Sequence, residues 1–186
     1  MDDARDSRPA ADRPVDAVVH LVVMGVSGTG KTTVAEALVD RLGWPYAEAD
    51  DFHPEDNRDK MAAGQPLTDE DRWPWLRALA AWATDRHAAG ESTVTTCSAL
   101  RRSYRDVLRT GAPGTVFVHL VGDEHELSRR MRGREHFFPP ALLESQLGTL
   151  EPLEPDEPGL AVDVGPPVAD VVAEVLRRLP RSRGPQ

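Results

Sequence analysis

Apolar residues follow two different periodicities between residues 17 and 179. The run at 18–24 predicts a strand that is buried on both faces of a parallel sheet, and other short apolar or β-branched runs predict further strands. Longer segments with apolar residues three or four positions apart predict amphipathic helices. The predicted strands are 18–24, 44–49, 92–96, 115–120 and 160–164, and the predicted helices are 31–42, 69–87, 99–109, 124–132, 140–150 and 168–179. Because strands and helices alternate, the expected fold class is α/β, with a parallel sheet flanked by helices.

Local signals mark the ends of two helices and of the ordered chain. Gly43 follows the first predicted helix, where glycine commonly supplies a left-handed backbone conformation. Thr68 precedes the second predicted helix, and its hydroxyl can cap free amide groups there. Residues 1–16 are rich in Asp, Arg, Ala and Pro, and residues 180–186 likewise lack large apolar side chains. Both segments are therefore predicted to be disordered.

The composition narrows the classes of function. The length of 186 residues favours a single domain, spanning 17–179. A formal net charge of −9 argues against general binding of nucleic acid or of an anionic membrane. No apolar stretch approaches the roughly 18 residues that span a bilayer, and none resembles a secretory signal. With Cys97 as the single cysteine, a disulfide framework is excluded and a cytoplasmic location is expected.

A glycine-rich segment joins the first predicted strand to the first predicted helix. Residues 25–32 read Gly-Val-Ser-Gly-Thr-Gly-Lys-Thr and fit G-x-x-x-x-G-K-[ST] at every fixed position. In this context the backbone amides surround an anion and the helix N-terminus adds a positive dipole end. Lys31 is expected to reach the β- and γ-phosphates of ATP, and the Thr32 hydroxyl to bind Mg²⁺. The predicted nucleotide-binding residues are Gly25, Val26, Ser27, Gly28, Thr29, Gly30, Lys31, Thr32 and Thr33. The alternative is a strand-to-helix turn that binds nothing.

Two motifs of other P-loop classes are missing from the sequence. A GTPase would need the guanine-reading N-K-x-D, which is absent. A Walker B segment, several apolar residues followed by Asp, is also lacking, because the strand at 92–96 runs into Cys97 and Ser98 instead. These absences favour a small-molecule kinase in which the P-loop hydroxyl, phosphates and water hold Mg²⁺.

Acidic residues follow the second predicted strand, where substrates bind in open α/β sheets. Asp50 is the candidate base that accepts the proton of an attacking hydroxyl and orients it in line with the γ-phosphate. Glu48 is expected closer to the water shell of the metal. The alternative for both carboxylates is a merely solvated acidic loop.

Longer motifs lie further along the chain. They read HPEDNRDKM at 53–61, GQPLTDEDRWPWL at 64–76, CSALRRSYRD at 97–106, HFFP at 136–139 and LLESQ at 142–146. In this order after a P-loop, they resemble the gluconokinase family, which carries H-P-x-x-N-x-x-K-M, G-x-P-L-x-D-x-D-R-x-P-W-L and C-S-A-L-x-x-x-Y-R-D. The resemblance runs from about His20 to Leu179.

The resemblance implies both a fold and an activity. The family shares its fold with shikimate kinase and the nucleoside monophosphate kinases, which implies a five-stranded parallel sheet with a mobile lid. The implied activity is ATP-dependent transfer of a phosphoryl group to the 6-hydroxyl of D-gluconate, in carbohydrate metabolism. ATP and Mg²⁺ are the implied cofactors, and a homodimer is the implied assembly. The family usually has Asp where this chain has Glu48, which leaves the metal-shell role of Glu48 open.

An anionic, hydroxyl-rich acceptor needs a cationic fork and short polar groups. Arg72 lies where the similar shikimate kinases bind a carboxylate, although it could instead pair with Asp69 or Asp71 on its own helix. The further substrate candidates are Lys60, Arg105, His53, Ser98 and His136. Lys60 and Arg105 could equally be solvated helix charges, and His53 could equally cap local structure beside Pro54.

A cluster of arginines precedes the lid motif. Arg130 and Arg134, one helical turn apart, are the candidates for neutralising charge on the transferring phosphoryl group, as lid arginines do in similar kinases. The alternative is a basic helix end that complements its own dipole. Two rival functions are a nucleotide-binding regulatory module without an acceptor site and a nucleoside monophosphate kinase.

Overall fold

The computed structural model describes residues 18–132 and 140–179. The predicted leader at 1–16 and tail at 180–186 lie outside the described residues. Five strands form one sheet: β1 (His20–Met24), β2 (Tyr46–Glu48), β3 (Thr93–Thr96), β4 (Thr115–Val121) and β5 (Gly159–Asp163). Their order across the sheet is β2-β3-β1-β4-β5, and every neighbouring pair is parallel. The predicted α/β class with a five-stranded parallel sheet is confirmed.

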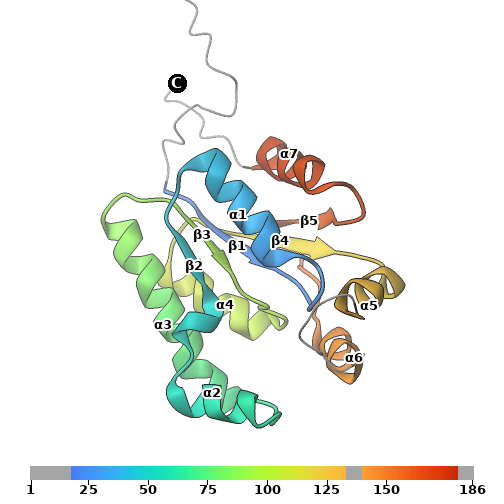
Figure 1. The fold of residues 1–186 in the computed structure, drawn as a ribbon. Coiled ribbons are helices and arrows are strands. Elements are labelled where there is room, and N and C mark those ends of the chain that lie inside the picture. Colours follow the sequence, from blue (N-terminus) through green and yellow to red (C-terminus); the bar gives the residue numbers. More distant parts are fainter. Residues whose placement is uncertain (1–17, 133–139, 180–186) are drawn as a thin grey trace, which may run out of the picture.

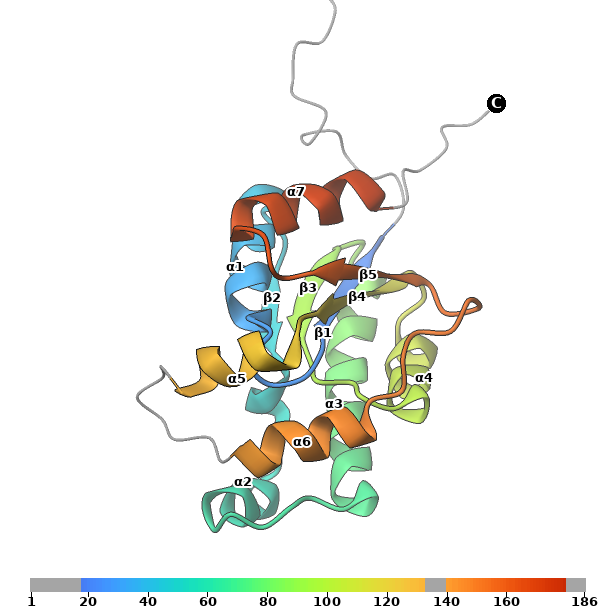
Figure 2. The same ribbon diagram turned by 90° about the vertical axis from the view of Figure 1, so that its right-hand side faces the viewer.

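Helices connect the strands and cover both faces of the sheet. They are α1 (Lys31–Leu42), α2 (Glu55–Ala62), α3 (Asp69–Ala88), α4 (Arg102–Gly111), α5 (Glu124–Arg132), α6 (Pro140–Thr149) and α7 (Val168–Arg178), with a short 3₁₀ helix, η2 (Ala49–Phe52). Helices α1 and α7 pack on one face, and α3 and α4 on the other (Figure 1). Figure 2 places α5 and α6 beside the loop that leaves β1, at the carboxyl edge of the sheet. No helix in the described part of the chain is long and apolar enough to cross a membrane.

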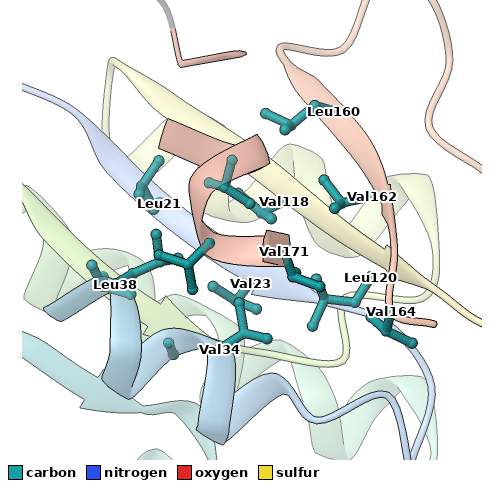
Figure 3. Packing of buried hydrophobic residues seen from close by; sticks show 14 of the residues in the cluster. Leu21, Val23, Val34, Leu38, Val118, Leu120, Leu160, Val162, Val164 and Val171 are labelled. Carbon is teal, nitrogen blue, oxygen red and sulfur yellow. The ribbon is translucent and has the colours of Figure 1, made fainter. Parts of the chain in front are cut away.

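The alternating side chains of the central strands build two cores. In β1, Leu21 and Val23 point to the α1 and α7 side, where they pack with Val34 and Val171 (Figure 3). The intervening residue Val22 points to the α3 and α4 side. Both cores are closed to solvent, and each fully buried aliphatic side chain stabilises the fold by roughly 1.5–3 kcal/mol. The continuous apolar runs of the sequence therefore correspond to strands that are buried on both faces.

The helix ends follow the predicted chemistry. Gly43 ends α1 in the left-handed conformation, with φ 68°, and donates its amide to Val39. Thr68 caps α3 through a capping box with Asp71, in which each side chain binds the other residue's backbone amide.

The sequence misplaced one helix boundary and missed one helix. The predicted helix at 99–109 begins only at Arg102, because Ala99 takes a left-handed backbone conformation with φ 43° that interrupts the helix. Helix α2 was not predicted, because its sequence is polar almost all round and Asn57 is its only buried residue.

The buried His20 at the amino end of β1, in contact with the half-buried His87 of α3, makes the stability of the fold sensitive to acid. The His20 ring is 2% exposed, and it lies 2.9 Å from the Thr93 hydroxyl and 3.1 Å from Nδ1 of His87. Burial, reinforced by His87, lowers the pKa of His20 to about 4. The unfolded chain therefore takes up this proton near pH 6.5 and the folded chain only near pH 4. Stability conferred by neutral His20 is lost as the pH falls through this window.

We expect the free energy of unfolding to fall by about 2 kcal/mol between pH 7 and pH 5 through His20 alone. Urea unfolding at the two pH values measures this difference. The exposed His125 supplies the control, since His125→Gln should keep the wild-type pH dependence. A His20→Asn protein with an undiminished pH dependence would exclude His20 as the acid-sensitive group.

Candidate active site

The loop between β1 and α1 has the backbone geometry of an anion cradle. Gly25 has φ 139°, and a Cβ atom there would lie 2.7 Å from the Leu120 carbonyl oxygen. Gly30 has φ 82° and precedes the first turn of α1. Both positions therefore require glycine, and the loop ends at a helix N-terminus whose dipole favours a negative charge.

Side chains within the loop hold its shape. The buried Thr29 hydroxyl donates to the Val26 carbonyl over 2.9 Å. The Lys31 ammonium donates to the same carbonyl over 3.2 Å, so the lysine folds back across the loop. Thr32 and Thr33 are exposed at the start of α1. The predicted nucleotide-binding segment is thus a loop held in shape by its own side chains, with one ammonium group and two exposed threonine residues at the start of the following helix.

A carboxylate from β2 faces Thr32. Glu48 Oε2 lies 3.4 Å from the Thr32 hydroxyl, and the carboxylate also accepts hydrogen bonds from Tyr46 and Thr96. Burial and the hydrogen bond to Glu48 raise the pKa of Tyr46. Glu48 therefore lies beside the hydroxyl predicted to bind Mg²⁺.

The donor set around Thr32 fits a magnesium ion held largely by phosphates and water. Within residues 18–132 and 140–179 there is no group of three or more His, Cys, Asp or Glu side chains that could hold a metal ion. One hydroxyl and one carboxylate are hard oxygen donors, which suit Mg²⁺ and leave several positions for nucleotide oxygens.

The candidate base Asp50 projects from η2 into solvent. Its side chain is 81% exposed, and its Oδ1 lies 3.9 Å from Nε2 of His53. His53 is buried, stacks on the Trp75 ring at 4.2 Å and lies 3.3 Å from the Asn57 amide nitrogen. That amide nitrogen can only donate, so Nδ1 accepts and the proton sits on Nε2, facing Asp50. His53 therefore packs against local structure, which is one of the two roles left open by the sequence, and its role as a substrate ligand stays a prediction.

Charged residues of the candidate site shift the pKa values of Cys97 and His53. Burial raises the pKa of the Cys97 thiol to about 12, and Asp50, Lys31 and Glu48 all act on it through charge. Burial also lowers the pKa of His53, on which Asp50 and Arg72 both act. Asp50 belongs to both sets. Asp50 is therefore near both Cys97 and His53.

The segment after β3 adjoins the loop directly. The Ser98 carbonyl accepts a hydrogen bond from the Gly25 amide over 3.4 Å. The next residue, Ala99, has a left-handed backbone that costs roughly 1–2 kcal/mol for a residue with a side chain. Ser98 thus lies at the carboxyl edge of the sheet, as predicted, on a backbone held in a strained conformation.

The cationic group on α3 is part of a larger cluster. Arg72 donates to Asp69 over 3.2 Å and to the Tyr104 hydroxyl over 3.4 Å. Arg101 donates to the other Asp69 oxygen over 2.9 Å, and Tyr104 donates to Asp69 over 2.6 Å. The Tyr104 hydrogen bond, more than either arginine, lowers the pKa of Asp69. Two guanidinium groups around one carboxylate leave a surplus positive charge. The sequence left open an ion pair of Arg72 with Asp69, and the structure contains it. The cluster of Arg72, Arg101 and Asp69 nevertheless keeps a net positive charge.

Two predicted substrate residues have other partners in the structure. Lys60 donates to Asp71 over 2.6 Å, lowering the pKa of Asp71 to about 2 and tying α2 to the start of α3. Arg105 is fully buried and is bound by Glu157 and by carbonyl oxygens on both sides of it. The prediction of Arg105 as a substrate ligand is therefore wrong, because no donor of its guanidinium faces a solvent-accessible site. Lys60 is engaged in helix packing and is left out of the proposed site.

The lid arginines are only partly described. Arg130 donates to Glu126 over 2.9 Å and to the Val164 carbonyl over 3.0 Å, so its guanidinium lies against the end of β5. Arg134 and His136 lie outside the described residues. The predicted phosphoryl-stabilising role of Arg130 and Arg134 stays a prediction.

The structure adds two residues that sequence reasoning did not select. Arg101 lies in the x positions of the C-S-A-L motif, and its proximity to Arg72 comes from the packing of α4 on α3. Gln146 accepts a hydrogen bond from the Ser27 amide inside the glycine-rich loop. The LLESQ motif held the signal for Gln146, but no periodicity in the sequence links α6 to that loop.

The fold is a five-stranded parallel sheet with a glycine-rich loop after its central strand. A lysine and a threonine begin the following helix, and a carboxylate lies beside the threonine. Together these features define a P-loop kinase of the small-molecule type. Residues 21–153 match the family model described as an AAA domain. The gluconokinase of Gluconobacter oxydans is 52% identical over 159 residues, covering 85% of this chain and 89% of that protein.

Two solved structures share both fold and sequence. An unliganded sugar kinase from Janibacter sp. superposes with a TM-score of 0.82 at 53% identity, covering 87% of this chain and 94% of that chain. A gluconokinase from Sinorhizobium meliloti gives a TM-score of 0.77 at 48% identity, covering 89% and 92%. The chain belongs to the gluconokinase family.

Proposed function

We propose that this protein is an ATP-dependent gluconokinase, which phosphorylates D-gluconate on its 6-hydroxyl to give 6-phospho-D-gluconate and ADP. Family membership supports this activity. The structural observation that carries it is the position of Asp50, whose exposed carboxylate lies on η2, directly after β2 at the carboxyl edge of the sheet, 3.9 Å from Nε2 of His53. A carboxylate at the carboxyl edge of the sheet, beside a glycine-rich loop with a lysine, is what a kinase for an alcohol needs.

The chemistry follows from these positions. Asp50 accepts the proton of the 6-hydroxyl as its oxygen bonds to the γ-phosphorus, while the bond from that phosphorus to the β,γ-bridging oxygen breaks and ADP leaves. Nε2–H of His53 faces the Asp50 carboxylate at 3.9 Å. Lys31 and the loop amides bind the phosphate oxygens and stabilise the charge that develops on them.

Magnesium would be held by Thr32, with Glu48 in its water shell, and would supply neutralising charge on the phosphates when bound. Glu48 already accepts from Thr32, Tyr46 and Thr96, which fixes its carboxylate beside the loop. The residue at this position is longer than the Asp usual in the family. A contact through water accommodates that extra length.

Arg72 and Arg101 would bind the carboxylate of gluconate. Their guanidinium groups share the single charge of Asp69, so the cluster keeps a net positive charge. Guanidinium groups recognise a carboxylate through two parallel hydrogen bonds, which a lysine cannot reproduce.

We expect Arg72→Lys to raise the KM for gluconate roughly tenfold or more and to change the KM for ATP by less than about twofold, because the positive charge stays and the fork is lost. Steady-state kinetics with each substrate varied in turn measures the split. Arg77→Lys, at an exposed position on the same helix, is the matched control. Equal KM values for gluconate in the two variants would remove Arg72 from the acceptor site.

The activity is tested directly by a coupled assay of ADP release with Mg²⁺, ATP and a panel of acceptors. The panel contains gluconate, other sugar acids, shikimate and nucleoside monophosphates. Turnover with gluconate, and 6-phosphogluconate as the product, is the expected result. Turnover only with another member of the panel would assign the protein to that acceptor, and acceptor-independent ATP binding would favour a regulatory module.

The family resemblance also suggests a homodimer, and we propose this assembly for the protein. Size-exclusion chromatography with light scattering should then report twice the mass of the chain. A mass equal to one chain would make the active unit a monomer.

A further inference from the structure

Helix α6 places a neutral side chain directly on the glycine-rich loop. Oε1 of Gln146 accepts a hydrogen bond from the Ser27 backbone amide over 2.6 Å. The two residues are 119 positions apart in the chain, so only the fold brings them together. Backbone amides of this loop are the groups expected to bind phosphate oxygens. Gln146 therefore lies at the edge of the proposed phosphate site.

The packing of α6 fixes the position of this side chain. Leu143 is 3% exposed and belongs to the same buried cluster as Val26 of the loop. Leu147 and Leu150 pack against that cluster from the following turn. Gln146 follows Leu143 by three residues, which puts both on the same side of the helix. The contact with Ser27 is thus held by a buried apolar anchor.

The carboxamide has a second polar atom that the contact leaves available. Oε1 is the acceptor and faces Ser27, so Nε2 is the donor end of the same planar group. Among residues 18–132 and 140–179, the structure gives Nε2 no hydrogen-bond partner. The Gln146 side chain therefore accepts a hydrogen bond from one amide of the loop, and its Nε2 can donate two hydrogen bonds close to the same point.

The chemical type of the side chain suits a site for a polyanion. A glutamate could bind the Ser27 amide more strongly through a charge-assisted hydrogen bond, but its charge would repel phosphate. An amide keeps the acceptor without the charge and adds a donor.

We propose that Gln146 is an ATP-binding residue, whose Nε2 donates to an oxygen of the terminal phosphate while Oε1 remains bound to Ser27. The inference rests on the proposed function, because it takes the loop to be the phosphate site of a kinase. It adds a ligand from α6 to the groups on the loop itself. The contact distinguishes ATP from ADP, since ADP lacks the oxygens that Nε2 would meet.

The test compares the binding of a non-hydrolysable ATP analogue and of ADP by isothermal titration calorimetry, with Mg²⁺ present. Gln146→Ala should weaken the ATP analogue about tenfold and ADP by less than about twofold, because one hydrogen bond to a charged oxygen is lost. Gln146→Glu should weaken the ATP analogue further, since a carboxylate then faces the terminal phosphate. Gln65→Glu makes the same chemical change at an exposed position outside α6 and should leave both affinities unchanged.

Three outcomes would overturn the proposal. Equal weakening of ATP analogue and ADP would make Gln146 a structural residue, and tighter binding of the ATP analogue to Gln146→Ala would make it a group that phosphate displaces. Unchanged affinities in both Gln146 variants would separate Gln146 from the nucleotide altogether. Thermal melting of each variant identifies any loss of folding. These binding measurements use no acceptor, so they stand even if the wild-type protein fails to phosphorylate gluconate.

Discussion

Asp50→Asn is expected to lower kcat by on the order of 10²-fold or more while leaving the KM for ATP nearly unchanged. Asparagine keeps the size of the side chain and its ability to orient a hydroxyl, but it cannot accept the proton that the hydroxyl must lose. The side chain is 81% exposed, so the substitution removes little packing and the fold should be retained. Single-turnover kinetics with saturating gluconate measures the phosphoryl-transfer step directly.

The neighbouring carboxylate provides the control for this experiment. Asp51 is also exposed, lies in the same 3₁₀ helix and makes the same change of charge when replaced by asparagine. Asp51→Asn should therefore keep kcat within about twofold, because an exposed charge that does not contact the reacting hydroxyl contributes little through solvent. An Asp50→Asn enzyme with near-normal kcat would exclude Asp50 as the base and require another acceptor for the hydroxyl proton.

The parts of the fold that the sequence predicted are those in which one physical signal dominates. The central strands β1 and β4 are buried on both sides, so their continuous apolar runs had no competing interpretation. The glycine-rich loop was found from its spacing, because Gly25 and Gly30 occupy backbone positions that other residues fit poorly. Helix α2 carries no apolar stripe, and its stability comes from contacts such as that between Asn57 and the Asp71 carbonyl. Such a helix leaves no periodic signal in the sequence.

The sequence predicted which types of residue form the candidate site, but it only partly predicted where these residues lie in the fold. Charged residues in a motif can bind a substrate or support the structure, and burial decides between the two. Arg72 and Arg105 both appeared as cationic forks for a carboxylate, yet Arg72 is half-buried and Arg105 is sealed in the interior. Arg101 meets Arg72 through the contact of α4 with α3, across a separation that no local pattern encodes.

The buried ion pair of Arg105 and Glu157 joins the segment after β3 to the segment before β5. Arg105 Nε and Nη2 donate to the two oxygens of Glu157 over 2.6 and 2.9 Å. Its Nη1 donates to the carbonyls of Ala99 and Glu151 over 3.1 and 3.0 Å. Burial alone would raise the pKa of Glu157, but the hydrogen bonds from Arg105 and the Glu154 amide outweigh it and lower that pKa. The guanidinium therefore holds the strained Ala99 backbone in place from within the core.

We expect Arg105→Met to lower the free energy of unfolding by about 3–5 kcal/mol, because Glu157 is left as a buried charge without its partner. Urea unfolding monitored by circular dichroism measures the loss. The double variant Arg105→Met/Glu157→Met should be more stable than either single variant, since no uncompensated charge remains. Arg177 and Glu174 form an exposed ion pair on α7, and Arg177→Met should cost less than about 1 kcal/mol. If Arg105→Met costs no more than Arg177→Met, the interior ion pair does not stabilise the edge of the sheet on which the glycine-rich loop and Ser98 lie.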